Sequence, residues 1–325
     1  MAFKTRITEL LGIEHPIVMG GMAGVGRAEL AAAVSNAGGL GIITGLTPGS
    51  PEKLAEEIAR LRSLTDQPFG VNLTIFPTIT PPPYDAYCQV IIDAGVKIVE
   101  TAAGVSPRPY WEKFQAAGVK IIHKCTSVRH ALSAERAGVD VVSIDGFECA
   151  GHPGEDDIPG LILIPAAADK LAIPIIASGG IGDARGLVAA LALGADGVNM
   201  GTRFCATVEA PLHVNFKAKM VENDERGTNL VFRTMHNTAR VAKNTVSDEI
   251  VRLEKGGAKF RDVAHLAAGE RGRNALASGD TEDGMWWASM SQGLVKDVPT
   301  VAELMARIVT EADTVLKERL AKMAA

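Results

Sequence analysis

The sequence of 325 residues has few cysteines and no long apolar run. Its four cysteines, Cys88, Cys125, Cys149 and Cys205, are scattered and none forms a C-x-x-C pair, so a disulfide scaffold is excluded and reduced thiols are expected. No apolar run approaches the roughly 20 residues that span a bilayer, and residues 1–10 contain no apolar core typical of a signal peptide. We therefore expect a cytoplasmic protein without membrane insertion.

Basic clusters are also lacking. Lysine and arginine number 33 against 38 aspartates and glutamates, which gives a formal net charge of -5 and argues against a nucleic-acid partner. The fractions of hydrophobic residues (47%) and charged residues (22%) are typical of a soluble globular protein rather than a disordered or fibrous one. The length allows one large domain or two moderate ones.

Glycine, in contrast, is abundant, with 34 residues, many of them directly after short apolar runs. Eight such runs alternate with segments of helical period, as expected of buried parallel strands. The predicted strands are 16–19, 39–43, 68–72, 97–100, 120–123, 141–145, 173–178 and 197–200. The predicted helices between them are 27–37, 51–64, 84–94, 110–117, 128–137, 164–170 and 184–193. Four of these helices end in Ala-Gly, a pair typical of a left-handed helix cap.

Eight strand–helix units in succession favour an α/β fold of the closed (β/α)8 type, a TIM barrel. A Rossmann sheet is the competing prediction, because a glycine-rich stretch follows the first strand at 20–26. Its glycines miss the G-x-G-x-x-G spacing, however, and the second strand ends in Ile43-Thr44-Gly45 without the acidic residue that would bind a ribose. The barrel is therefore preferred.

The strand–helix rhythm breaks after the eighth strand. Residues 207–283 are more charged and show helical patterns without intervening strands, while 298–323 reads as a long amphipathic helix on the outside of the barrel. We predict a barrel formed by 1–206 and 288–325, and an inserted, mainly helical subdomain at 207–287. A proline-rich loop at 77–83 follows the third strand and is a candidate cover for the barrel mouth.

Active sites of such barrels lie at the carboxyl ends of the strands. The seventh strand ends in Ser178-Gly179-Gly180 and the eighth in Gly201-Thr202-Arg203. In a barrel these two ends are adjacent, and their backbone N–H groups suit a phosphate. The alternative is that both segments are merely tight turns.

Lys124, Asp145 and His152 are the polar residues of greatest interest at the other strand ends. Lys124 could form a Schiff base, bind an anion or stand beside an electron-rich ring, unless it is only a solvated lysine of the rim. His152 follows Ala150-Gly151, where backbone can pass close to a ligand, and its imidazole could donate a proton or a hydrogen bond. Asp145 needs hydrogen-bond donors in so apolar a setting, and contact with a ligand is the simplest explanation.

A zinc site is conceivable from His123 and Cys125 on one strand with Cys149 and His152 after the next. We prefer small buried cysteines, because structural zinc sites favour paired ligands on short knuckles, and we predict no metal.

With these residues assembled, the chain resembles the nitronate monooxygenase superfamily, formerly called 2-nitropropane dioxygenases, which are FMN-dependent barrels with an inserted helical domain. The resemblance covers essentially the whole length and is carried by 16–22, 70–73, 123–126, 145–154, 177–180 and 200–204. Within the superfamily, H-K-C-T at 123–126 and D-G-F-E-C-A-G-H-P-G-E-D-D at 145–157 look like the bacterial NADH:quinone reductase branch. True nitronate monooxygenases have a G-G-H-x-G loop, from which Cys149-Ala150-Gly151-His152-Pro153-Gly154 departs.

The resemblance implies that the FMN phosphate is held by Gly179, Gly180, Gly201 and Thr202. It implies that the rest of the cofactor is contacted by Gly21, Met22, Asn72, Thr74, Lys124, Asp145, Ala150, Gly151 and Ser178. It also places His152 near the reactive part of the flavin, and with Lys124 as the cation that stabilises a reduced flavin these two are the candidate catalytic residues.

Three functions follow as hypotheses. The first is oxidation of NADH or NADPH by FMN with transfer of two electrons to a quinone. The second is oxidation of alkyl nitronates with O2. A non-redox barrel lyase or isomerase, which would bind a sugar phosphate and use Lys124 to form an imine, is the third.

Overall fold

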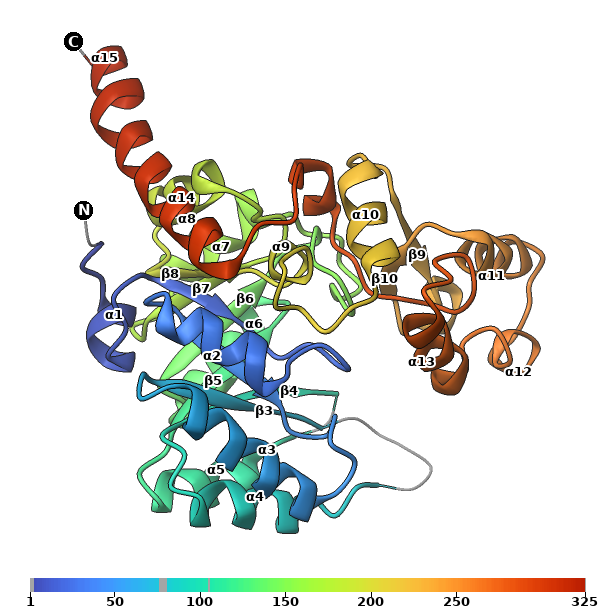
Figure 1. The fold of residues 1–325 in the computed structure, drawn as a ribbon, viewed down its shortest axis with the longest axis horizontal. Helices are drawn as coiled ribbons and strands as arrows, with labels where there is room; N and C mark the ends of the chain where they lie inside the picture. Colours follow the sequence, from blue (N-terminus) through green and yellow to red (C-terminus); the bar gives the residue numbers. More distant parts are fainter. Residues whose placement is uncertain (1–2, 76–80, 105, 325) are drawn as a thin grey trace.

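Eight parallel strands form a closed barrel in the order β1 to β8, with β8 pairing back onto β1. The structure is a computed structural model and describes residues 3–75, 81–104 and 106–324 (Figure 1). The strands are β1 (Ile17–Met19), β2 (Leu40–Thr44), β3 (Phe69–Ile75), β4 (Ile98–Ala103), β5 (Lys120–Cys125), β6 (Val141–Asp145), β7 (Ile175–Ser178) and β8 (Gly197–Asn199). The predicted TIM barrel is confirmed, and the Rossmann alternative is excluded by the closure of the sheet.

Helices surround the barrel. They are α2 (Ala28–Asn36), α3 (Pro51–Leu64), α4 (Tyr84–Asp93), α5 (Arg108–Ala116), α6 (Val128–Arg136), α7 (Gly160–Ala168), α8 (Ala184–Ala192), the short α9 (Thr202–Cys205) and α14 (Val301–Thr314). The π-helical turn η3 (Val315–Leu320) and α15 (Ala321–Ala324) continue α14, so the predicted helix 298–323 is present. It packs against α2 and α8 and closes the outer ring.

The predicted helix 164–170 begins one residue before Pro165, a residue typical of a helix start. The observed helix α7 begins four residues earlier, at Gly160, and contains Pro165 in its interior. The four Ala-Gly helix ends are as predicted, since Gly38, Gly95, Gly118 and Gly138 all have positive φ. The predicted loop 77–83 lies largely outside the described residues.

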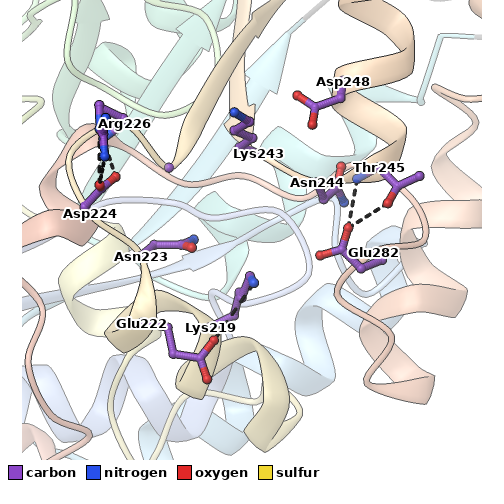
Figure 2. A pocket seen from close by; sticks show the side chains of 11 residues that line it. Lys219, Glu222, Asn223, Asp224, Arg226, Lys243, Asn244, Thr245, Asp248 and Glu282 are labelled. Atoms are coloured by element: carbon purple, nitrogen blue, oxygen red, sulfur yellow. Dashed lines mark hydrogen bonds and ion pairs between the residues drawn. The ribbon is translucent and has the colours of Figure 1, made fainter.

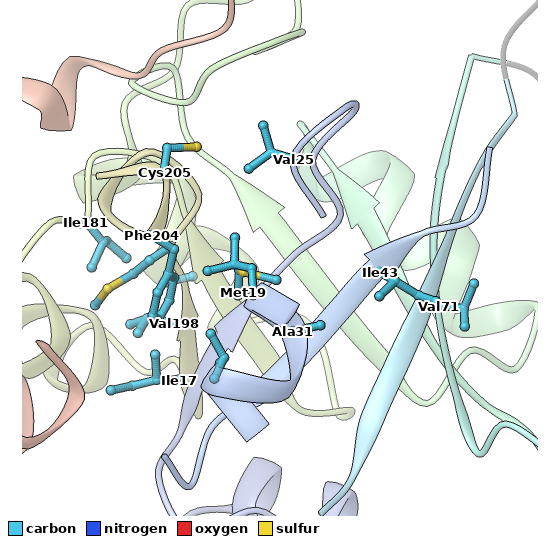
Figure 3. Close-up of a cluster of buried hydrophobic side chains, with 14 of the residues drawn as sticks. Ile17, Met19, Val25, Ala31, Ile43, Val71, Ile181, Val198, Phe204 and Cys205 are labelled. Atoms are coloured by element: carbon cyan, nitrogen blue, oxygen red, sulfur yellow. The ribbon is translucent and has the colours of Figure 1, made fainter. Parts of the chain in front are cut away.

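Two apolar layers hold the barrel together. One lies between strands and helices, where Ile17, Met19 and Val198 lie near Phe204 and Ile43 lies beside Val71 (Figure 3). The second layer lies inside the barrel, toward the amino ends of the strands. It consists of inward-facing side chains of most strands, including Val18, Ile42, Ile98, Ile122, Val141 and Ile176. Helix α1 (Arg6–Leu11), which the sequence analysis missed, closes this end with Ile7 and Leu11. The amino end of the barrel is therefore an apolar plug, and only the opposite end offers room for chemistry.

The segment between barrel strand β8 and helix α14 forms a projecting unit (Figure 1). Its elements are α10 (Val214–Glu222), β9 (Thr228–Val231), the 3-10 turn η1 (Arg233–Met235), β10 (Ala239–Ala242), α11 (Thr245–Lys255), α12 (Phe260–Val263) and α13 (Gly269–Ser278). The 3-10 turn η2 (Met290–Leu294) then leads back to the barrel.

Strands β9 and β10 form an antiparallel pair, so the expectation of helices without strands in 207–283 was wrong. Both strands are only four residues long, and their pairing depends on packing against α11 rather than on an alternating pattern. Val231, Val241 and Ile250 belong to a separate apolar cluster within this segment. The domain boundaries at 207 and 287 stay a prediction. Within the described ranges, no helix is long and apolar enough to cross a membrane.

Candidate active site at the barrel mouth

The inward-facing side chains change from apolar to polar at the carboxyl end of the barrel. Because side chains alternate along a strand, Glu100 stands above Ile98, Lys124 above Ile122, and Ser178 above Ile176. Asn72, Asp145 and Asn199 complete this polar layer, and all of its members except Lys124 are buried. Buried polar groups need partners, so the contacts of this layer define the site.

Glu100 is the centre of one half of the layer. Its Oε2 accepts hydrogen bonds from the backbone N–H of Gly21 at 2.8 Å and from Nδ2 of Asn72 at 2.7 Å. Thr74 in turn donates from Oγ1 to Oδ1 of Asn72 at 2.9 Å. The first, third and fourth strand ends are thus joined through one carboxylate.

Asn199 makes the equivalent connection on the opposite side. Its Oδ1 accepts from the N–H of Gly20 at 2.8 Å and its Nδ2 donates to Oγ of Ser178 at 3.3 Å. Met22, in the loop after β1, lies 3.4 Å from Sγ of Cys205 through its Sδ. This loop therefore lies against the segment after β8, as the predicted cofactor pocket requires.

Lys124 and Asp145 form an ion pair inside the mouth. Nζ of Lys124 donates to Oδ1 of Asp145 at 3.1 Å, and the exposed fractions of the two side chains are 21% and 9%. Burial would lower the pKa of Lys124, but the negative charges of Asp145 and Glu100 outweigh it, so the pKa is raised above its ordinary value. Lys124 is therefore a permanent cation at neutral pH.

The two predicted phosphate loops lie at the ends of β7 and β8. Gly179 and Gly180 have φ of 92° and 76°, and a Cβ there would lie 2.9 Å from the Gly146 carbonyl and 3.1 Å from Cβ of Glu148, respectively. Packing between loops therefore requires both glycines. At Gly201 a Cβ would meet only Met22, at 3.5 Å from its Sδ, so the approach to this residue is open.

The backbone N–H groups of these loops are a further feature of the mouth. Among the described residues, none accepts a hydrogen bond from the N–H groups of Gly179, Gly180 or Gly201. Thr202 Oγ1 accepts from the N–H of Ser289 at 3.0 Å, which brings the segment after the insertion to the same place. A group of donors without acceptors is the arrangement that an anion satisfies.

The loop after β6 carries Ala150, Gly151 and His152 and is held by the insertion. Gly151, with φ of 78°, forms a two-way backbone bridge with Arg240 of β10, at 3.1 and 2.6 Å. The buried guanidinium of Arg240 donates from Nη2 to the carbonyl of Phe147 at 2.9 Å and lies 4.6 Å from the centre of its ring. Glu155 also accepts from the N–H of Thr238 at 2.8 Å.

His152 lies at the outer edge of the mouth, against the ring of Trp287 at 6.0 Å between ring centres. Burial lowers the pKa of His152, and the charge of Glu155 only partly compensates, so the imidazole is neutral at physiological pH.

The zinc alternative gains no support. His123 is buried with Nδ1 at 2.8 Å from Oγ1 of Thr101, and its ring packs edge-on against Trp111 at 4.7 Å. Burial lowers its pKa to about 4 and raises that of Cys125 to about 12. In the described part of the chain, no three histidine, cysteine or acidic side chains are grouped so as to hold a metal ion.

A polar cavity of about 610 Å³ lies in the insertion, between α10 and the start of α11 (Figure 2). Two of its carboxylates have partners within the lining: Asp224 pairs with Arg226 at 2.8 Å, and Glu282 accepts from the N–H and the hydroxyl of Thr245 at 2.9 and 2.8 Å. We take the barrel mouth as the candidate active site instead, because the partly buried cation Lys124 and the glycine loops after β7 and β8 both lie there.

Several residues of the mouth escaped the sequence analysis. Asn199 ends β8, whereas Glu100 is the third residue of β4 and ends only the predicted strand 97–100. A carboxylate at the end of that predicted strand was a usable signal. No signal in the sequence identified Arg240 or Trp287, because nothing in the neighbouring residues indicates that they reach the loop of His152.

Comparison with known proteins agrees with this geometry. The family model described as "Nitronate monooxygenase" matches the chain over residues 4–87 and 77–311. A probable nitronate monooxygenase of Staphylococcus saprophyticus is 30% identical over 97% of this chain and 99% of its own length.

Two solved structures are similar over nearly the whole chain. FabK from Thermotoga maritima has a TM-score of 0.90 and 37% identity, covering 98% of this chain and 99% of the other. The nitroalkane oxidase from Streptomyces ansochromogenes has a TM-score of 0.82 and 29% identity, covering 96% and 99%.

Proposed function

The chain belongs to the nitronate monooxygenase family, and we propose that it is an FMN-dependent NAD(P)H:quinone reductase. The observation that carries this proposal is the permanent cation Lys124, held inside a mouth whose glycine loops present N–H groups without acceptors. A cation beside a flavin favours the anion formed on reduction.

The residues present fit FMN. Its phosphate needs several donors, and Gly179, Gly180, Gly201 and Thr202 lie on two adjacent loops with an open approach at Gly201. The remaining predicted contacts, Gly21, Met22, Asn72, Thr74, Asp145, Ala150, Gly151 and Ser178, come from the β1, β3, β6 and β7 ends of the same mouth. Bound there, FMN would accept a hydride from a nicotinamide and return two electrons to an acceptor.

The chain's own residues hold and orient the reactants. Asp145 and Glu100 keep Lys124 charged, and Asp145 also accepts a hydrogen bond from its Nζ. Glu100 and Asn199 fix the loop after β1, because they accept hydrogen bonds from its backbone N–H groups. His152, neutral and at the entrance, can offer a hydrogen bond to the oxygen of an acceptor. The net reaction, NADH + H⁺ + quinone → NAD⁺ + hydroquinone, consumes one proton from solvent and needs orientation more than a strong base.

Nitronate oxidation with O2 is the second candidate, and the names of the staphylococcal relative and the streptomycete oxidase favour it. A lyase that forms an imine at Lys124 is disfavoured, because imine formation needs a neutral amine and the raised pKa keeps this one protonated.

The test begins with anaerobic addition of NADH or NADPH to the FMN-loaded protein. We expect the flavin absorbance to bleach, a benzoquinone to restore it within the turnover time, and oxygen to restore it more slowly. Steady-state turnover with NADH plus quinone is then compared with turnover of propyl-2-nitronate plus O2 on the same preparation. Efficient consumption of nitronate with a flavin that NADH leaves oxidised would reject the quinone reductase assignment.

Two variants check the cofactor site in the same experiment. Gly201→Ala should weaken FMN binding at least about tenfold while leaving the fold intact, because its Cβ meets no backbone of the chain. Gly269→Ala, at the start of α13, is the matched control and should bind FMN like the parent.

A further inference from the structure

Trp287 is an exposed aromatic residue at the edge of the proposed site. The segment 285–289 contains two adjacent tryptophans that face opposite ways. Trp286 is 4% exposed and packs edge-on against Phe216 at 5.2 Å, whereas Trp287 is 40% exposed and lies beside His152. Packing of the insertion therefore accounts for Trp286 but not for Trp287.

Backbone contacts on both sides hold Trp287 in this place. The carbonyl of Trp286 accepts from the N–H of Ala242 at 2.9 Å, and the N–H of Ser289 donates to Thr202 at the end of β8. Ser289, two residues after Trp287 in the chain, is thus bonded to Thr202 of a predicted phosphate loop. His152 is equally constrained, since its neighbour Gly151 is bridged to Arg240.

The two rings together form a largely apolar surface made of two aromatic faces. Their planes are inclined by 41° and neither is charged at neutral pH, because burial keeps the imidazole neutral. Flat unsaturated rings pack on such a surface in offset or tilted stacks, whereas a small branched aliphatic molecule gains little from it. An exposed indole at the entrance of a redox site therefore indicates the shape of what enters.

We propose that Trp287 is a specificity-determining residue, and that with His152 it forms a platform that selects planar ring acceptors of the quinone class over small aliphatic nitronates. This inference rests on the proposed function, because it concerns the electron acceptor of the same site. It adds a residue of the insertion to a site otherwise built by the barrel.

The test compares Trp287→Ala and Trp287→Phe with the parent, all as FMN-loaded protein. With NADH and a methylated benzoquinone, Trp287→Ala should raise the KM for quinone about three- to tenfold, and Trp287→Phe should restore most of the affinity. Ferricyanide, which has no planar ring, should be reduced at unchanged rates. Phe260→Ala removes an aromatic residue that is 58% exposed elsewhere in the insertion and should change none of these values.

Binding without turnover separates this inference from the proposed function. The other tryptophans, Trp111 and Trp286, are buried, so quenching of protein fluorescence by the oxidised quinone should report mainly Trp287 and be lost in Trp287→Phe. If the parent protein reduces quinone and Trp287→Ala has the same KM for quinone as the parent, the platform is rejected and the proposed function stands. Equal losses with quinone and ferricyanide would also reject it, because they would indicate general damage. A parent that never reduces quinone rejects the proposed function, and unquenched fluorescence would then reject the platform as well.

Discussion

The barrel mouth and the junction between the insertion and the loop of His152 are built in different ways. In the mouth, buried side chains such as Glu100, Asn72 and Asn199 bond to one another and to the backbone at 2.7–3.3 Å. The junction uses one buried arginine, Arg240, together with more exposed contacts such as the pair between Arg233 and Asp157. Loss of a partner is costly in stability for a buried polar group, because the surrounding dielectric constant is low. An exposed group that loses its partner is solvated instead, so the cost is small.

This difference suggests a division of labour. The barrel holds charges in one arrangement, suited to a cofactor that must not move, and the insertion positions a loop and an aromatic side chain at the entrance. The proposed function therefore predicts that variation in the insertion alters the choice of acceptor without disturbing the cofactor site. The following variants test that contrast.

The largest effect is expected for Lys124→Met. It leaves Asp145 as a buried charge without its partner and should lower the free energy of unfolding by about 3–5 kcal/mol, with loss of bound FMN. Urea unfolding and the visible flavin spectrum measure the two effects. The double variant Lys124→Met/Asp145→Asn removes both charges and should regain most of the stability but not the NADH-dependent turnover. If the double variant is as unstable as Lys124→Met, the unpaired charge of Asp145 is not the cause of the lost stability.

His123 gives a pH-dependent effect of somewhat smaller size. Its pKa is about 4 in the folded protein against 6.5 for an unperturbed histidine, so the unfolded chain binds the extra proton first as the pH falls. Its contribution to stability is complete above pH 6.5 and is lost between pH 6.5 and about 4, up to roughly 3 kcal/mol. Urea unfolding of the parent and of His123→Asn at pH 7 and pH 5 isolates this contribution. A difference between the two proteins that does not change with pH would contradict it.

Arg240→Met tests the junction and should have the smallest effect on stability. It removes the hydrogen bonds to Phe147 and Thr228 and should cost about 2 kcal/mol, with faster hydrogen exchange at Gly151 and turnover reduced severalfold. Arg233→Ala is the control, because its pair with Asp157 on the same loop is about two-fifths exposed and is worth less than about 1 kcal/mol. Equal exchange rates in both variants would show that Arg240 does not position the loop.

Local sequence was sufficient for most of the barrel. Continuous apolar runs such as 141–145 identify the strands, because both faces of each strand are buried. The glycines after α2, α4, α5 and α6 identify the helix ends, because a left-handed cap favours glycine. It failed for β9 and β10, whose four residues each have no marked alternation, and for α1, whose six residues are too few to show a helical period.

The sequence by itself determined the barrel, the strand ends that carry polar residues and the glycine loops, because each depends on the order of residues within one strand–helix unit. Tertiary structure alone decided which of these residues act together. The pKa of Lys124 is raised because pairing of β5 with β4 and β6 brings Glu100 and Asp145 to it, and Trp287 meets His152 where Arg240 of β10 is bridged to Gly151. These contacts join residues distant in the chain, and the electrostatics and packing that they produce depend on distances in space, which no local pattern encodes.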